Sequence, residues 1–408
     1  MVNNKVKKQE NFLTWLFFFT WGFIFLSRLA VTFLLPIIKP ELSINNQEVG
    51  YISFVSAGCY AISGIIFGYV SDVTGLRKRW LVILTVIAGV ATSCIALTST
   101  FNQLLVCLAI VGIGIGPSMT LIMTILARES SEGKFGNNSG IVSSGVAVIA
   151  LFIGPTLLTT IATKASWQIA FLATGIPLII IGILIGKYVD EVKVETVISS
   201  EPESKTSLIE LFKYRNIPLC ILIAITGMAG YWTIMIFAPT YMVDIAKVSV
   251  QQMGWITSAM GFIFIFYAVM VPKLSDKYGR KSMLIIFYAL CIVAPLCMFV
   301  FRGSMVSVAA YVLFGGIPGA MIPLFAVLIP METVPDRLRG TAGSIILGCG
   351  EIFGGALYPI LAGRIGDEKG LPFMMLIGAI LFAVTIIISL SIIESNKLLL
   401  KVEKVQEL

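Results

Sequence analysis

Histidine is absent from this 408-residue chain, and Asp, Glu, Lys and Arg together make up only 12% of it. Without an imidazole the chain cannot form an H-E-x-x-H zinc site or a His-based catalytic triad. Its seven cysteines show no paired spacing that would suggest a metal or disulfide framework. We therefore expect no enzyme activity, no metal site and no cofactor.

Most of the chain consists of long apolar segments. The hydrophobic fraction is 57% and the mean hydropathy is +0.96, whereas a soluble domain carries roughly 25% charged residues. The sequence therefore predicts an all-α polytopic membrane protein. Crossing about 30 Å of hydrocarbon takes around 20 residues, and twelve runs are long enough to form transmembrane helices: 12–36, 48–71, 80–99, 103–127, 138–163, 168–187, 217–243, 251–274, 282–301, 305–331, 340–364 and 371–393.

The chain repeats itself with an offset of 204 residues, half its length. Asp72 and Asp276 each lie in a short charged loop between two apolar runs, and the same offset relates Gly50 to Gly254, Gly75 to Gly279, Gly136 to Gly340 and Pro155 to Pro359. Internal repeats of this size are typical of secondary transporters, whose substrate site lies where the repeats meet. We predict two pseudo-symmetric six-helix bundles, 1–187 and 217–408, joined by a polar cytoplasmic linker at 188–216.

Lys and Arg sort to one side of the predicted membrane. With the amino terminus inside, every Lys and Arg except Arg28 falls in a cytoplasmic segment or in one of six outer positions, Lys39, Lys164, Lys247, Arg302, Arg364 and Lys369. Cytoplasmic segments of membrane proteins carry such an excess, so we expect a multi-pass cell-membrane protein with both termini in the cytoplasm. The net charge of +7 follows from this sorting, and we expect the lipid bilayer as a partner and no nucleic acid.

The two charged loops resemble a signature of the major facilitator superfamily, G-x-x-x-D-x-x-G-R-[KR], found between the second and third helices of that family. The first loop, GYVSDVTGLRKR, contains Gly68, Asp72 and Arg77. The second loop, PKLSDKYGRK, contains Asp276 and Arg280, with a proline in place of the first glycine. The resemblance covers essentially the whole chain and implies the major facilitator fold.

The resemblance also implies a gate. In the family the first aspartate is thought to hold the cytoplasmic side shut against helix eleven. A glycine at a helix end allows a neighbouring helix to approach, and an aspartate there can face the positive amino end of that helix. We therefore expect gating by Gly68, Asp72, Arg77, Asp276 and Arg280, and the basic residues also hold their loops inside.

Arg28 is the only charged residue between positions 12 and 38, and an arginine in mid-membrane costs about 2.5–3.5 kcal/mol on insertion scales. A guanidinium in a central cavity would bind a carboxylate or phosphate through its planar fork; the alternative is that its head reaches the outer interface. The repeat places Trp232, beside Tyr231, at the symmetric position. We predict that Arg28, Tyr60, Tyr231 and Trp232 bind substrate, with packing between helices as the alternative for the aromatic residues.

Glu351 is the only charged residue between Arg339 and Arg364, and it lies midway between them. A carboxyl near the bilayer centre is able to take up and release a proton, as a proton-coupled transporter requires. The symmetric residue is Ala147, so the fold itself does not require an acid here. We predict a role in proton coupling, and the alternative is a structural glutamate that is hydrogen-bonded locally.

The Arg28-bearing first helix and the run Trp167–Phe171 resemble the organic-anion/proton symporter branch of the family, although Ser27 stands where that branch has an acid. Drug exporters of the family have a glycine-spaced fifth helix, and Ala150 stands at one expected glycine. The resemblance implies uptake of a small organic anion together with protons, and proton-driven export of lipophilic compounds stays open as the alternative. The sequence does not favour a receptor, which would more often have seven spans. It does not favour a channel either, because we find no sequence pattern of a selectivity filter. We expect a monomer.

Overall fold

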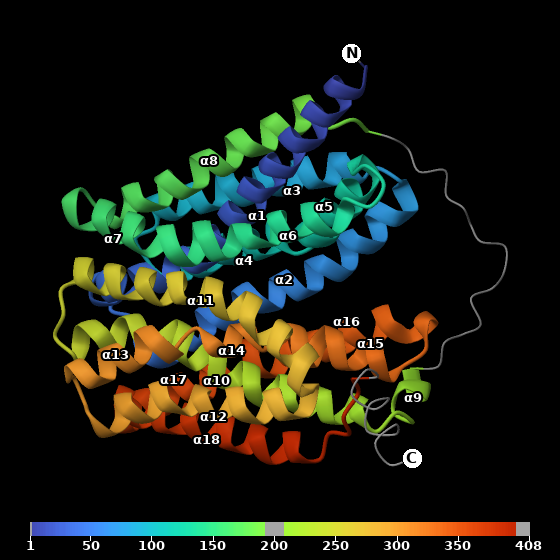
Figure 1. The fold of residues 1–408 in the computed structure, drawn as a ribbon. Helices are drawn as coiled ribbons and strands as arrows, with labels where there is room; N and C mark the ends of the chain where they lie inside the picture. Colours follow the sequence, from blue (N-terminus) through green and yellow to red (C-terminus); the bar gives the residue numbers. More distant parts are fainter. Residues whose placement is uncertain (1, 192–207, 397–408) are drawn as a thin grey trace, which may run out of the picture. The chain divides into compact units, whose positions relative to one another are not determined.

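Helices hold nearly all of the residues that the computed structural model describes, which are 2–191 and 208–396 (Figure 1). The middle of the predicted linker, 192–207, lies outside them. The helices of the first half are α1 (Val2–Glu41), α2 (Asn46–Thr74), α3 (Arg77–Cys94), η1 (Ile95–Leu97), α4 (Phe101–Ile115), α5 (Ser118–Glu129), α6 (Phe135–Gly145), η2 (Val146–Ile153), α7 (Gly154–Lys164) and α8 (Trp167–Tyr188).

The second half is also helical. Its helices are α9 (Leu208–Leu211), α10 (Asn216–Asp244), α11 (Val250–Tyr278), α12 (Arg280–Val300), α13 (Met305–Phe314), α14 (Ile317–Ala320), η3 (Leu324–Leu328), α15 (Ile329–Thr333), η4 (Asp336–Leu338), α16 (Arg339–Cys349), η5 (Gly350–Leu357), α17 (Tyr358–Lys369) and α18 (Leu371–Leu390). Consecutive helices join into longer rods, and twelve rods within the described residues are long and apolar enough to cross a membrane. This confirms the predicted all-α polytopic architecture with twelve spans.

The helices run beyond the apolar ranges that predicted them. The eleventh span was expected at 340–364 and extends over Asp336–Lys369, and the eighth was expected at 251–274 and extends over Val250–Tyr278. Hydropathy reports only the hydrocarbon core, which is about 30 Å thick, whereas the polar headgroup layers bring the bilayer to about 40–45 Å. The polar ends of these helices are therefore of a length to cross the headgroup layers.

The chain forms two compact units. One unit comprises residues 1–44, 55–198 and 249–262, and the other comprises 45–54, 199–248 and 263–408. The start of α2 therefore groups with helices of the second half of the chain, and the start of α11 groups with helices of the first half.

Packing inside the units follows the repeat. In the first unit α3 packs against α8, and α1 packs against η2. In the second unit α12 packs against α18, and α10 packs against η5. Figure 1 shows α8 running alongside α3, and α18 alongside α12. The third and sixth spans of each half thus pair in the same way, as do the first and fifth.

Three π-helical stretches each end two residues before a proline: η2 before Pro155, η3 before Pro330 and η5 before Pro359. Proline has no backbone N–H, and its ring clashes with the carbonyl four residues earlier. A wider π turn relieves that clash. Because η2 and η5 are separated by 204 residues at both ends, the internal repeat extends to this local distortion.

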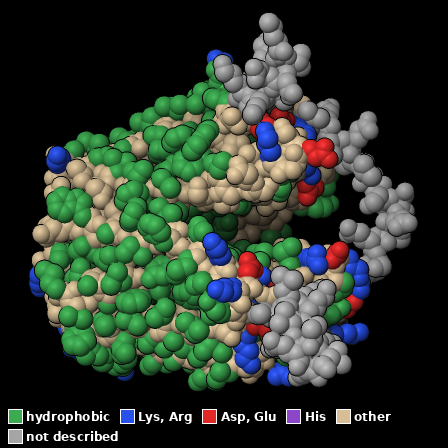
Figure 2. Space-filling view, in the orientation of Figure 1, with side chains coloured by type: hydrophobic (Ala, Val, Ile, Leu, Met, Phe, Trp, Pro, Cys, Tyr) green, Lys and Arg blue, Asp and Glu red, His purple; other side chains and the backbone are tan. Residues whose placement is uncertain are grey.

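Large apolar side chains are exposed on the surface of the described helices. Figure 2 shows hydrophobic side chains over most of the visible face of each unit. Ile65 is 73% exposed, Val269 is 67% exposed and Ile183 is 60% exposed, all of them within membrane-length helices. Large apolar side chains on the outside of a helix bundle are stable in lipid, where water is absent.

Candidate substrate and gating sites

Arg28 is buried in the first unit. Its side chain comes from α1 and is 7% exposed. The guanidinium carbon Cζ lies 4.7 Å from the ring centroid of Tyr60, in α2, and 5.8 Å from that of Phe25. A cation above an aromatic face is stabilised by the ring quadrupole. The structure therefore brings together two of the predicted binding residues, and it buries the arginine head.

Tyr231, Trp232 and Glu351 gather in the second unit. The rings of Tyr231 and Trp232, both in α10, have centroids 5.3 Å apart. Glu351 lies in η5, the stretch that packs against α10. A Cβ added to Gly355 would lie 2.8 Å from Trp232 Nε1 and 3.0 Å from Glu351 Oε2, so the indole N–H and the carboxylate approach the same point.

The chemistry of the two groups is complementary. Arg28 and Tyr60 offer a cation with a planar set of donors, and Trp232 and Glu351 offer an N–H donor and a group that can carry a proton. Gly355 carries no side chain, and a Cβ there would come too close to both the indole and the carboxylate, so the close approach of these two groups depends on this glycine. Among residues 2–191 and 208–396, no group of three or more Cys, Asp or Glu side chains is placed to hold a metal ion.

The two gating loops share one backbone device. Gly75 and Gly279 have positive φ angles of 67° and 96°, a conformation that favours glycine because it lacks a Cβ. Each glycine makes the sharp turn between two long helices, from α2 to α3 and from α11 to α12. These are the glycines of the repeated signature.

The first gating loop is open to solvent. The Asp72 carboxylate lies 3.1 Å from Arg77 Nη2, and the aspartate side chain is 69% exposed. A Cβ added to Gly68 would meet no described atom within 4 Å. In this structure Asp72 therefore pairs with the arginine of its own loop, and Gly68 has no close helix neighbour.

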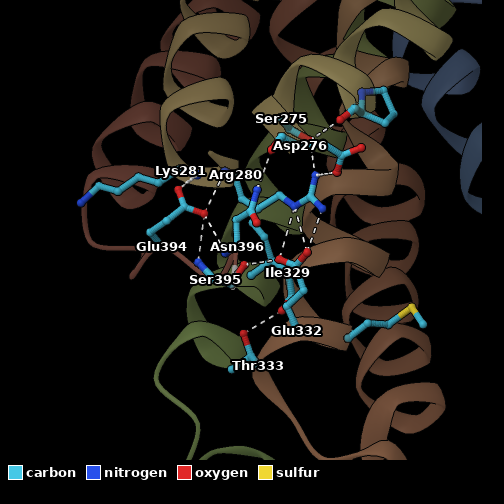
Figure 3. A network of polar contacts seen from close by, with 12 residues as sticks. Ser275, Asp276, Arg280, Lys281, Ile329, Glu332, Thr333, Glu394, Ser395 and Asn396 are labelled. Atoms are coloured by element: carbon cyan, nitrogen blue, oxygen red, sulfur yellow. Dashed lines mark hydrogen bonds and ion pairs between the residues drawn. The ribbon is translucent and has the colours of Figure 1, made fainter. Parts of the chain in front are cut away.

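The second gating loop forms a polar network around the buried side chain of Arg280 (Figure 3). Arg280 is 6% exposed on its side chain, and its guanidinium lies 2.6 Å from Asp276 Oδ1 and 2.8 Å from Glu332 Oε1. Ser395, after the last helix, donates its hydroxyl to Glu332 at 2.7 Å. Removing one partner of a buried ion pair leaves an uncompensated charge, so this network fixes α11, α12 and α15 to one another.

Two carboxylates that the sequence analysis did not single out cap the helices after the gating loops. Glu191 accepts hydrogen bonds from the backbone N–H groups of Lys78 and Arg79, at 3.1 and 2.8 Å. Glu394 accepts from those of Arg280 and Lys281, at 3.0 and 3.1 Å (Figure 3). The signal that would have found them is position, because each acid follows the last span of its half and the two lie close to the 204-residue offset.

Sequence comparison places the chain among known transporters. The family model described as Major Facilitator Superfamily matches residues 13–359. A Cupriavidus pinatubonensis protein described as "Probable 4-methylmuconolactone transporter" is 25% identical, over 85% of this chain and 82% of its own. The hexuronate transporter of Bacillus subtilis is 25% identical, over 87% and 88%. The sialic acid transporter of Escherichia coli is 23% identical, over 94% of each chain.

Solved structures share the fold. A bacterial homologue of the lysosomal transporter Spinster, in an inward-facing and occupied conformation, superposes with a TM-score of 0.81 at 15% identity, covering 93% of this chain and 96% of its own. A D-xylose-proton symporter superposes with a TM-score of 0.73 at 16% identity, covering 95% and 98%. Together with the family match over most of its length, the twelve spans among the described residues and the repeated charged loops, this shows that the chain is a membrane transporter of the major facilitator superfamily.

Proposed function

We propose that this chain carries a small organic anion of the carboxylate type across the membrane by alternating access, coupled to protons. The observation that carries the proposal is the buried Arg28, held above the ring of Tyr60. A charge with this cost in the membrane is retained where it has a function, and a guanidinium binds a carboxylate through two parallel hydrogen bonds.

The relatives support the substrate class. Their descriptions name 4-methylmuconolactone, sialic acid and hexuronate, each of which carries a carboxyl group. In our proposal Arg28 binds this carboxylate, while Tyr60, Tyr231 and Trp232 contact the rest of the molecule. Glu351 takes up and releases the proton. Alternating access then follows from rocking of the two bundles, as in transporters built from repeats.

The gating residues act at one end of the helices. Gly68, Asp72 and Arg77 in the first loop, and Asp276 and Arg280 in the second, govern closure of the side where these loops lie. We assign that side to the cytoplasm from the distribution of Lys and Arg, with both termini there and the cell membrane as the location.

Ligand binding to the purified protein tests the substrate class. Glucuronate and N-acetylneuraminate should raise the thermal midpoint of the wild type, because only a ligand that binds the native state stabilises it. Arg28→Ala should weaken this binding about 10- to 100-fold, the equivalent of a lost charged hydrogen bond of about 1.5–3 kcal/mol. Arg364→Ala is the matched control, because Arg364 is exposed and pairs with Glu368 on its own helix.

The rival function gives a different result in the same assay. A proton-driven exporter of lipophilic compounds should be stabilised by a lipophilic cation such as tetraphenylphosphonium and by neither acid. Stabilisation of the wild type by that cation alone would remove the organic-anion proposal. Equal stabilisation of wild type and Arg28→Ala by the acids would remove Arg28 as the residue that binds the carboxylate.

A further inference from the structure

A groove runs between α1 and α8 on the surface of the first unit. Both helices belong to that one compact unit, and they pack against each other. The groove has a volume of about 400 Å³, and every residue that lines it is apolar. Sites for small molecules measure about 300–1,000 Å³, so the groove is large enough for a ligand.

The groove has a buried floor and exposed walls. Leu16 of α1 and Ile181 of α8 are buried, whereas Trp15, Phe19 and Ile180 are each about half exposed. Both helices are long and apolar enough to cross a membrane, and side chains exposed on such helices face hydrocarbon rather than water. The occupant that this surface fits is therefore an apolar chain.

The groove is as long as one leaflet of a bilayer is deep. Its lining runs from Phe12 to Phe23 on α1 and from Leu184 to Pro177 on α8. At about 1.5 Å per residue, the stretch of α1 rises about 16 Å. The hydrocarbon core of a bilayer is about 30 Å thick, so one leaflet contributes about 15 Å of it. This is the depth that the acyl chain of a single lipid occupies.

A cation lies at the end of the groove that Phe12 lines. The ring of Phe12 meets the ring of Tyr188 edge to face, with centroids 5.1 Å apart. The Lys187 Nζ lies 5.2 Å from the centroid of that same tyrosine ring. Lys187 and Tyr188 are the last two residues of α8, and both are exposed. Tyrosine and lysine at the end of a span are typical of the level of the lipid headgroups.

The lysine and tyrosine pair alone would not indicate a lipid site. The same pair ends α11, where the Lys277 Nζ lies 5.0 Å from the ring centroid of Tyr278. Neither of these two residues lines the groove between α1 and α8. What distinguishes Lys187 is its place beside a groove that is one leaflet deep, and Lys277 therefore supplies a matched control.

We propose that this groove binds one acyl chain of an anionic phospholipid, whose phosphate pairs with Lys187. Lipid tails are as apolar as the side chains around them, so the chain is held by van der Waals contact with the groove. Selectivity comes from the headgroup, because a lysine at the membrane surface attracts anionic lipids. The lipid is a bound partner of the first unit and is separate from the transported substrate.

Photo-crosslinking tests whether the groove holds a lipid. The photoreactive residue p-benzoylphenylalanine replaces Ile180 in one variant and Ile183 in another. Ile183 lies one turn away on the same helix and is 60% exposed, but it does not line the groove. After purification in detergent and irradiation, peptide mass spectrometry should find a phospholipid adduct at position 180 and none at position 183. Equal lipid adducts at both positions, or detergent adducts alone, would overturn the site.

Native mass spectrometry of the purified full chain tests the headgroup. Phosphatidylglycerol and phosphatidylcholine with identical acyl chains are titrated separately, and we expect the wild type to bind phosphatidylglycerol more tightly. Lys187→Gln should weaken phosphatidylglycerol binding about fivefold, the equivalent of about 1 kcal/mol for one lysine near the membrane surface. Lys277→Gln should leave that affinity unchanged.

A groove-filling variant tests the acyl chain in the same assay. Leu184→Trp places a larger side chain in the groove, so it should weaken the binding of both lipids. If that variant does not fold, Lys187→Gln still decides the headgroup contact. Equal affinity of the wild type for the two lipids, or equal phosphatidylglycerol affinity in wild type and Lys187→Gln, would overturn the proposal.

Discussion

Glu351 and Arg28 are single charges in spans that are otherwise uncharged near their middle, and each is placed by a different kind of neighbour. Arg28 lies over an aromatic face, and Glu351 lies in a π-helical turn where its carboxylate shares the space beside Gly355 with the Trp232 indole. A charge in the middle of a membrane span costs about 2.5–3.5 kcal/mol on insertion scales. This is why both residues carry testable consequences.

Glu351→Gln should separate substrate exchange from proton-driven accumulation. The amide keeps the size and the hydrogen-bonding capacity of the carboxyl group but cannot bind or release a proton. In proteoliposomes loaded with glucuronate, we expect exchange at a rate near that of the wild type, and loss of uphill uptake when an inward proton gradient is imposed. Undiminished uphill uptake would contradict the coupling role.

Gly355→Ala tests the convergence of Trp232 and Glu351. The new methyl group would lie 2.8 Å from Trp232 Nε1 and 3.0 Å from Glu351 Oε2, which is closer than side chains normally approach, so one of the two must move. We expect substrate affinity to fall at least about tenfold, as for a displaced binding group, while the thermal midpoint of the ligand-free protein changes little. Gly348→Ala is the control, because a Cβ there meets no described atom within 4 Å.

At this scale the sequence predicted the rare charges but not their partners. Arg28 and Glu351 are visible because charge is scarce within spans. The approach of Trp232 to Glu351 joins residues 119 positions apart, and the cap that the Asp367 carboxylate forms on the amino end of α2 spans more than 300. Neither contact has a local sequence signal, because it depends on which helices pack together.

The helix ends near the gating loops are stabilised by acids from remote segments. Glu191 caps α3 and Glu394 caps α12. The predicted helix boundaries could not reveal these caps, because apolar periodicity ends where the hydrocarbon ends, and the acids follow the final span of each half. A capped helix end resists fraying, since its first N–H groups keep their acceptors.

Removing these caps should lower stability separately and additively. We expect Glu191→Ala and Glu394→Ala each to cost about 1–2 kcal/mol, seen as a lower thermal midpoint in detergent. The double variant should show the sum of both losses, because the sites lie in different units and share no partner. Glu368→Ala, which breaks an exposed pair with Arg364, should change the midpoint by much less. Equal midpoints for Glu394→Ala and wild type would show that the cap contributes nothing.

The two halves of the molecule match in helix packing as well as in the order of their apolar segments. The 204-residue offset predicted two matching halves, and the matched packing of α3 with α8 and of α12 with α18 agrees with it. The offset could not predict that α2 and α11 each give their first turns to the other compact unit. That exchange depends on the close backbone contacts at Gly50 and Gly254, where a side chain would not fit.

Chemical labelling of intact cells tests the orientation proposed from Lys and Arg. Asn102, at the start of α4, and Glu132, in the turn after α5, are both exposed and lie at opposite ends of the α4 and α5 rod. We expect Asn102→Cys to react with a membrane-impermeant maleimide added outside, and Glu132→Cys to react only after the cells are permeabilised. The reverse pattern would place both termini outside.

The π turns of η2 and η5 each contain one residue more than an α-helical turn would. A turn closed by hydrogen bonds five residues apart takes up one residue more than an α turn. If such a turn tightened to the α form, the parts of the rod on either side would rotate against each other by about 100°, the angle per residue. Side chains beyond the proline would then exchange their neighbours while the rod kept its direction and its backbone hydrogen bonding. A screw motion of this kind is open to the Glu351 rod and closed to helices without a π turn, such as α3.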